Sequence, residues 1–123
     1  MTVPTTIPAE MHEAITMIER LGGRALVDKI VTMFESSARD RFAKLEVLLA
    51  AGDTHQVSRI GHAMKGSAAQ VGATAFRDLA AALEKEAATL DPEGLAAFVV
   101  RLRDAFATSL EQLAACRSAG AQG

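Results

Sequence analysis

The 123-residue sequence has few aromatic residues, few prolines and a single cysteine. It contains no Trp, no Tyr, 5 Phe, 3 Pro and a single cysteine, Cys116. One cysteine excludes an internal disulfide and suits a reducing compartment. The length fits a single domain that buries a core without disulfides or a structural metal. We therefore expect one domain that packs around an apolar core.

Strong charge and long apolar runs are also absent. The formal net charge is −2, so bulk electrostatics argue against a nucleic-acid partner, although a local basic patch stays open. No apolar run approaches the length of about 18 residues that a membrane span needs. The N-terminus has neither the basic start nor the apolar core of a signal peptide. We predict a cytoplasmic protein without a membrane partner.

Alanine, about a fifth of the chain, favours helix over strand. Apolar residues recur at helical spacing in five segments, about 9–22, 24–51, 53–71, 74–89 and 92–117. Helix-ending and capping residues separate them: Gly22-Gly23, Gly52 with the Asp53/Gln56 capping box, Gly72, and Asp91-Pro92. Short connections favour antiparallel neighbours, so we predict an all-α fold, an antiparallel up-down four-helix bundle with an additional short N-terminal helix. The domain would span 9–117, between an N-terminal tail at 1–8 and a disordered C-terminal tail at 118–123.

The segment GHAMKGSAAQVGA, residues 61–73, has a polar face that the bundle does not need. On a helical wheel, His62 lies about 140° from the core stripe, with Gly66 and Ala69 further along the same flank and Lys65 at its edge. Gly66 costs about 1 kcal/mol relative to alanine inside a helix. Either another molecule must approach the helix backbone beside His62, or this glycine arose by neutral drift in a bundle that is stable enough to tolerate it.

The residues around His62 suggest chemistry, although each also has a plain structural reading. Lys65, three residues on, would neutralise an anion on the imidazole, or is an ordinary surface lysine. In a helical hairpin that turns at Ala73, Glu84 lies at the height of His62, because each is eleven residues from the turn. Its carboxylate would then fix the imidazole tautomer, or is a plain surface glutamate.

The heptapeptide His62-Ala63-Met64-Lys65-Gly66-Ser67-Ala68, with Gly72-Ala73 and Leu83-Glu84 downstream, resembles the histidine-containing phosphotransfer (HPt) domain. The likeness covers roughly residues 10 to 115. It implies a helical bundle whose histidine carries a phosphoryl group between the aspartates of receiver domains, in hybrid histidine kinases and response regulators. Gly61 departs from the alanine often found before this histidine, and we expect it to loosen local packing.

The resemblance also implies a role for each residue of the motif. His62 would be phosphorylated at Nε2, Lys65 would balance the phosphoryl charge, and Glu84 would orient Nδ1–H. Gly66 would leave room for the receiver, on a flank that Ala69 shares. Arg59 and Arg77, expected near the same surface, would complement an acidic receiver pocket or are plain surface charge.

The chain would be a carrier without autokinase activity, since it has no GxxxxGK[ST] nucleotide loop. We expect no cofactor or metal on this chain, with Mg²⁺ supplied by the receiver, and a monomer. The alternative function is a non-catalytic helical-bundle interaction module. A metal site at His55 and His62 has no obvious third ligand, and nothing in the sequence demands a phosphatase.

Overall fold

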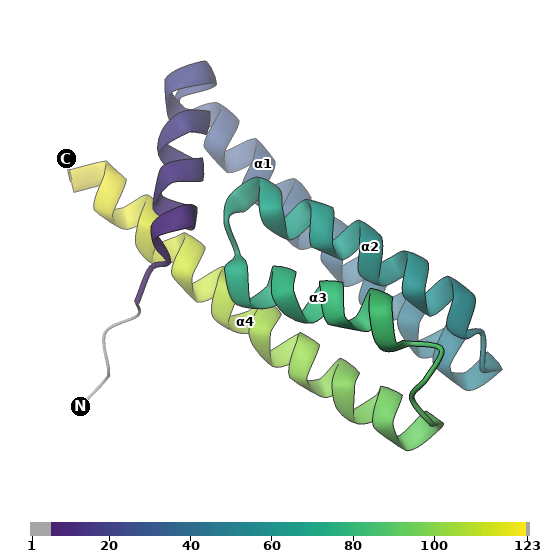
Figure 1. Cartoon of the computed structure of the whole chain (residues 1–123). Helices are drawn as coiled ribbons and strands as arrows, with labels where there is room; N and C mark the ends of the chain where they lie inside the picture. Colours follow the sequence, from purple (N-terminus) through teal and green to yellow (C-terminus); the bar gives the residue numbers. More distant parts are fainter. Residues whose placement is uncertain (1–5, 123) are drawn as a thin grey trace.

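The structure is a computed structural model that describes residues 6–122, and the side chains of 6–117. It contains four helices and, over these residues, no strand: α1 (Ala9–Ala51), α2 (Thr54–Val71), α3 (Thr74–Glu86) and α4 (Pro92–Gln122) (Figure 1). The predicted all-α class is confirmed. Of the predicted N-terminal tail, residues 1–5 lie outside the described part, and the first helix begins directly after Pro8.

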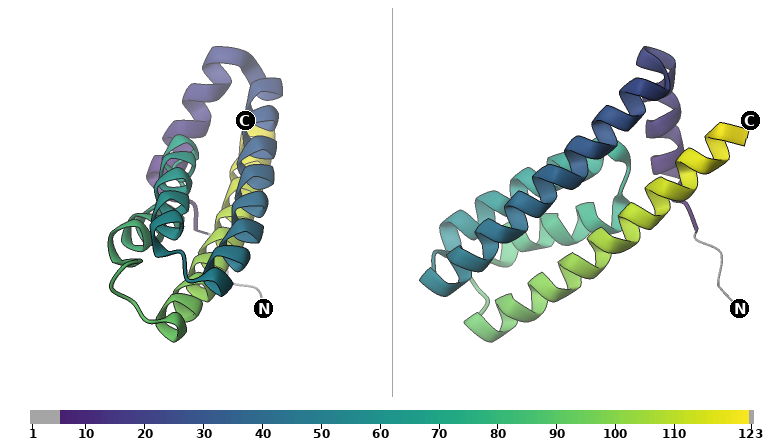
Figure 2. Two further views of the ribbon diagram at one scale, coloured as in Figure 1. Left: turned by 90° about the vertical axis from the view of Figure 1, so that its right-hand side faces the viewer. Right: turned by 180° about the vertical axis from the view of Figure 1, so that it is seen from behind.

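The four helices pack around one core. α2 packs closely against α3 and also against α1, and the long part of α1 lies beside α4 (Figure 2). Four phenylalanine rings join three of the helices, with centroids 5.5 to 6.2 Å apart in the contacts among them: Phe34 and Phe42 of α1, Phe76 of α3 and Phe106 of α4. Few aromatic residues are therefore enough to link the helices through the core, because four of them meet at one place.

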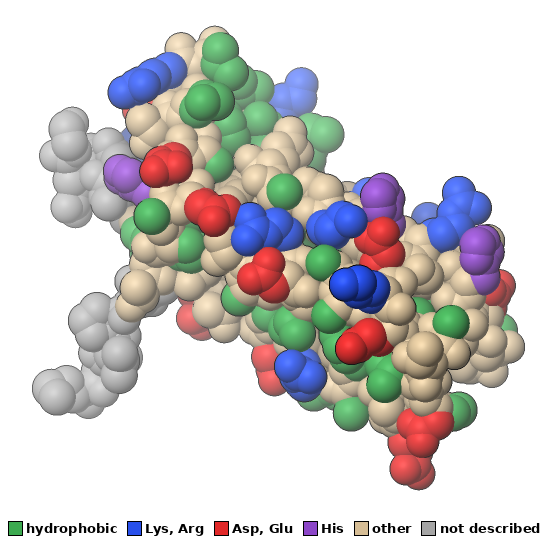
Figure 3. All heavy atoms as spheres, in the orientation of Figure 1, with side chains coloured by type: hydrophobic (Ala, Val, Ile, Leu, Met, Phe, Trp, Pro, Cys, Tyr) green, Lys and Arg blue, Asp and Glu red, His purple; other side chains and the backbone are tan. Residues whose placement is uncertain are grey.

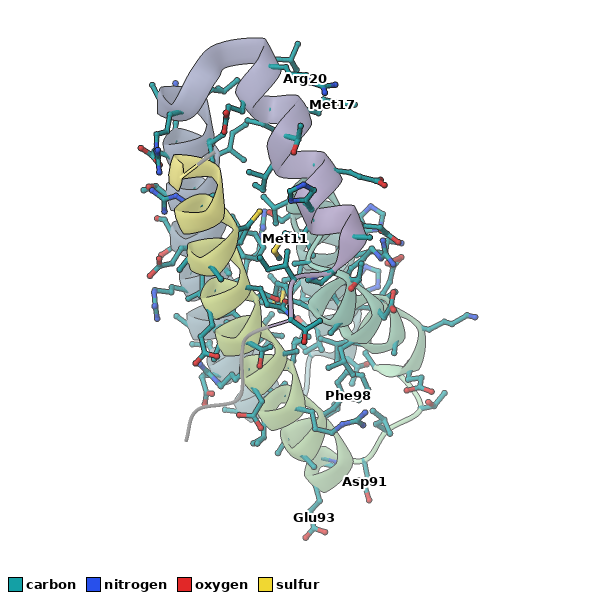
Figure 4. All side chains as sticks on the ribbon, turned by 90° about the vertical axis from the view of Figure 1, so that its left-hand side faces the viewer. Met11, Met17, Arg20, Asp91, Glu93 and Phe98 are labelled. Carbon is teal, nitrogen blue, oxygen red and sulfur yellow. The ribbon has the colours of Figure 1, made fainter. Side chains whose placement is uncertain are left out.

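A sharp bend at Gly23 divides α1. This residue has φ 72° and ψ −170°, outside the helical region, in the glycine pair that ends the first segment of the sequence pattern. The N-terminal arm (residues 9–22) therefore turns away from the rest of α1 and crosses the end of the bundle (Figure 1). Figure 4 shows Met11 directed into the bundle, where it is fully buried, while Met17 points outward.

Two left-handed glycines set the connections on either side of α2. Gly52 and Gly72 both have φ 69° and end α1 and α2 respectively, as their positions in the sequence predict. Asp53 starts α2, and its Oδ1 accepts a hydrogen bond from the Gln56 N–H at 3.1 Å. Because only Gly72 and Ala73 separate α2 from α3, the chain reverses at once and the two helices pack side by side.

Two predicted helix ends differ from the structure. α3 ends at Glu86 rather than at Thr89, because both the N–H and the hydroxyl of Thr89 bond to the Glu86 carbonyl and form a turn. α4 continues to Gln122, whereas the sequence predicted disorder from Ser118. Ala119 and Ala121 favour helix there, and no proline interrupts it. None of the described helices contains an apolar stretch of the length that a membrane span requires.

Candidate functional site

His62 lies on the outer face of α2, and its side chain is 70% exposed. Figure 3 shows histidine, basic and acidic side chains side by side over α2 and α3. The core side of the same helix buries Val57, Met64, Ala68 and Val71. The apolar stripe thus places the imidazole in solvent, as its position on the helical wheel predicts.

Glu84 of α3 connects His62 to Lys65. Its two carboxylate oxygens lie 3.1 and 3.2 Å from His62 Nδ1, and Oε2 lies 2.9 Å from Lys65 Nζ. The three side chains come from two adjacent turns of α2 and one position of α3. The equal distances along the hairpin, counted from Ala73, correctly predict that Glu84 faces His62.

The charge state of Glu84 determines the tautomer of the imidazole. Hydrogen bonds from Lys65 and then from His62 hold the pKa of the Glu84 carboxyl below its usual value. At neutral pH the carboxylate can only accept hydrogen bonds, so Nδ1 of His62 must carry the hydrogen. Nε2 of the neutral ring then has its lone pair free, on an exposed side chain. An arrangement of this kind presents Nε2 as a nucleophile.

Lys65 binds the carboxylate in this structure. Its side chain is 37% exposed, and its ammonium group lies against Glu84. The sequence predicts that this positive charge neutralises an incoming anion. In the structure it neutralises the Glu84 carboxylate instead.

Gly66 and Ala69 extend the exposed flank beyond His62. A Cβ atom added at Gly66 would meet no atom within 4 Å outside its own helix backbone. Packing within the described chain therefore does not require a glycine here.

The two arginines predicted for the binding surface have different environments. Arg59 is exposed on α2, about one turn before His62. Arg77 bonds to Glu10 of the N-terminal arm at 2.6 Å and to the neighbouring Asp78 at 3.2 Å, which raises its pKa. Arg77 thus ties the N-terminal arm to α3.

Ser58 and Gly61 also shape the site, and sequence reasoning missed both. The Ser58 hydroxyl donates to the Glu84 backbone carbonyl at 2.7 Å. A Cβ atom at Gly61 would lie 2.8 Å from the Glu84 nitrogen and 3.0 Å from the Ala80 carbonyl oxygen. The expectation that Gly61 loosens packing was therefore wrong, because its missing side chain lets the two helix backbones touch. Two small residues three apart, on the α3 side of α2, were the available signal.

Comparison with known families agrees with this geometry. The model of the Hpt domain family matches residues 29–117, most of the chain. The chain belongs to the Hpt domain family. No curated protein matched it. Hpt domains take part in histidine phosphotransfer in two-component relays and interact with receiver domains.

The Hpt match covers the residues of the candidate site but not the N-terminal arm. His62, Lys65, Gly66 and Glu84 all lie within the matched range. Among the residues that the structure describes, no three His, Cys, Asp or Glu side chains gather in a group that could hold a metal ion. The predicted site residues that the structure brings into contact are His62, Glu84 and Lys65.

Proposed function

We propose that the chain is a histidine phosphotransfer protein of a multistep phosphorelay. His62 would accept a phosphoryl group on Nε2 from an aspartate of a hybrid kinase's receiver domain and pass it to a response regulator. The observation that supports this most strongly is the contact of the Glu84 carboxylate with Nδ1 of an exposed His62. This contact leaves Nε2 as the free nitrogen.

The transfer would be in line and reversible. The Nε2 lone pair forms the bond to phosphorus while the bond from phosphorus to the aspartyl oxygen breaks, and its electron pair returns to the aspartate. The ring keeps its Nδ1 hydrogen and gains positive charge, which the Glu84 carboxylate stabilises. Lys65 would move its ammonium group from Glu84 to the phosphoryl oxygens. The receiver would contribute Mg²⁺, and this chain would act as a carrier without autokinase activity.

The flank beyond His62 would receive the partner. Gly66 and Ala69 leave the α2 backbone open to a receiver, and Arg59 offers a cation to its acidic pocket. Arg77 would join them by leaving its ion pair with Glu10. We propose that the chain is a cytoplasmic monomer, an antiparallel up-down bundle with the N-terminal arm as its accessory helix.

Phosphotransfer from a panel of phosphorylated receiver domains with Mg²⁺ tests this function. We expect acid-labile, base-stable phosphate on the wild type and none on His62→Gln. The matched control is His55→Gln, which removes another exposed histidine of α2 and should accept phosphate normally. Equal label on His62→Gln would assign the chemistry to another residue. No label on any folded variant, from competent receivers, would favour the non-catalytic interaction module.

A further inference from the structure

Glu84 contacts α2 through its backbone as well as through its carboxylate. Its carbonyl oxygen accepts the 2.7 Å hydrogen bond from Ser58, and its nitrogen and Cα lie against Gly61. Ser58 is about one turn before His62, and Gly61 directly precedes it. The residues that fix the Glu84 backbone thus lie on the same two turns of α2 as the imidazole that its carboxylate meets.

Ser58 bonds differently from two other helical serines, Ser37 and Ser109. A helical serine can donate to the carbonyl four residues earlier in its own helix. Ser37 does so to Met33 at 2.8 Å, and Ser109 does so to Ala105 at 2.9 Å. Ser58 instead crosses to α3. Its hydroxyl therefore adds a bond between helices, in place of a bond within one helix.

The register of α3 against α2 decides where the carboxylate lies. A glutamate side chain has several rotatable bonds, so a fixed backbone greatly reduces the positions that its oxygens can reach. The two oxygens lie 3.1 and 3.2 Å from Nδ1, near the upper end of the range for a hydrogen bond. A small displacement of α3 away from α2 would therefore weaken this hydrogen bond.

We propose that Ser58 is a positioning residue for phosphotransfer, acting through Glu84 on the tautomer of His62, with Gly61 permitting the close approach. The expected change in transfer rate rests on the proposed function. The expected change in the tautomer of His62 does not, because the tautomer can be observed in the unphosphorylated protein. Both residues lie outside the set that the sequence identified.

Ser58→Ala tests the proposal by nitrogen-15 NMR of the histidine rings and by the rate of phosphoryl transfer. We expect wild-type His62 to be mainly protonated on Nδ1, and Ser58→Ala to move the ring toward a mixture of tautomers. The transfer rate should fall about fivefold, the factor that one ordinary hydrogen bond is worth. The matched control is Ser109→Ala, a buried serine of α4 whose hydroxyl bond stays within its helix. It should lower the melting temperature without changing the tautomer or the rate.

Gly61→Ala provides a second, independent variant. The added Cβ would meet backbone atoms of α3, which cannot rotate away as a side chain would. We expect the same change of tautomer as in Ser58→Ala. A wild-type tautomer in Ser58→Ala, with only a lower melting temperature, would overturn the proposal and make Ser58 purely structural. If the wild type accepted no phosphate from any donor, the proposed function would fail, and the tautomer comparison would still decide the role of Ser58.

Discussion

At the scale of residues, Glu84 is the centre of the site. It accepts from His62 Nδ1 and from Lys65 Nζ, while Ser58 and Gly61 of the facing helix fix its backbone. An ionised carboxylate in this position selects the tautomer and, in the proposed function, would compensate the charge of a phosphorylated ring.

The depressed pKa of Glu84 predicts how the site responds to acid. The stability that its two pairs contribute is fully present above the unfolded pKa of about 4.3 and is lost as the pH falls through the lower folded pKa. Lys65→Ala should raise the pKa of Glu84, because the hydrogen bond from Lys65 is the main cause of its depression. Carbon-13 NMR of the Glu84 carboxyl measures this midpoint. Lys85→Ala removes an adjacent exposed lysine and should leave it unchanged; equal midpoints in Lys65→Ala and the wild type would contradict the prediction.

Substitution of Gly66 should change stability and partner access in opposite directions. Gly66→Ala should raise the free energy of unfolding by about 1 kcal/mol, because the added methyl group improves helix propensity and meets no neighbour. Phosphoryl transfer from a receiver should nevertheless slow, and Gly66→Leu should slow it further. Denaturant unfolding and transfer kinetics measure the two effects. Ala97→Leu, which adds bulk to an exposed position of α4, should leave transfer unchanged; transfer at the wild-type rate in Gly66→Leu would remove the steric argument.

The sequence predicts the contact of His62 with Glu84 because a two-residue turn fixes the register of the hairpin. It does not predict the ion pair of Lys65 with Glu84, since a long flexible side chain can reach several partners from the same position. The sequence also does not predict the role of Gly61, because a close approach between helices depends on their packing as well as on residue size.

At the scale of elements, the bend of α1 brings the N-terminal arm onto the turn between α2 and α3. A Cβ atom at Gly72 would overlap the backbone of Met11, and Arg77 of α3 binds Glu10 of the arm. The glycines at 22 and 23 predict an interruption, and Gly72 predicts a helix end. The contact of Gly72 with Met11 of the arm follows from tertiary packing, which local patterns do not encode.

Gly72 and Gly52 allow a matched comparison of what the arm contributes. Both are left-handed with φ 69°, but only the Cβ of Gly72→Ala would meet backbone atoms of another segment. Gly52→Ala should destabilise the fold by about 1 to 2 kcal/mol, the cost of a left-handed alanine. Gly72→Ala should cost more, because the arm must also move. Chemical denaturation measures both variants, and equal losses would show that the arm contributes nothing at this contact.

At the scale of the whole molecule, the bundle supports an exposed site with a small aromatic cluster. Phe34, Phe42, Phe76 and Phe106 join three of the four helices, while α2 enters the core through aliphatic residues. Helical periodicity predicts the helices and their buried faces, because burial dominates that pattern. It does not predict that these rings meet, since each comes from a distant part of the chain.

The aromatic cluster should govern global stability. Phe76 is fully buried and contacts the other three rings, so Phe76→Ala should lower the free energy of unfolding by about 3 to 5 kcal/mol. Phe98 is also buried, but its ring stacks under Arg101 and is not part of the four-ring cluster, so Phe98→Ala should cost less. Chemical denaturation distinguishes them, and a smaller loss for Phe76→Ala than for Phe98→Ala would contradict a core centred on this cluster.

We infer that His62 reacts through Nε2 while Glu84 holds Nδ1. Treatment of the nitrogen-15-labelled protein with phosphoramidate, followed by phosphorus and nitrogen NMR, tests it without a partner protein. We expect one phosphohistidine, on Nε2 of His62, and none in His62→Gln. Phosphate on Nδ1 of His62, on another residue, or nowhere in the folded wild type would contradict it.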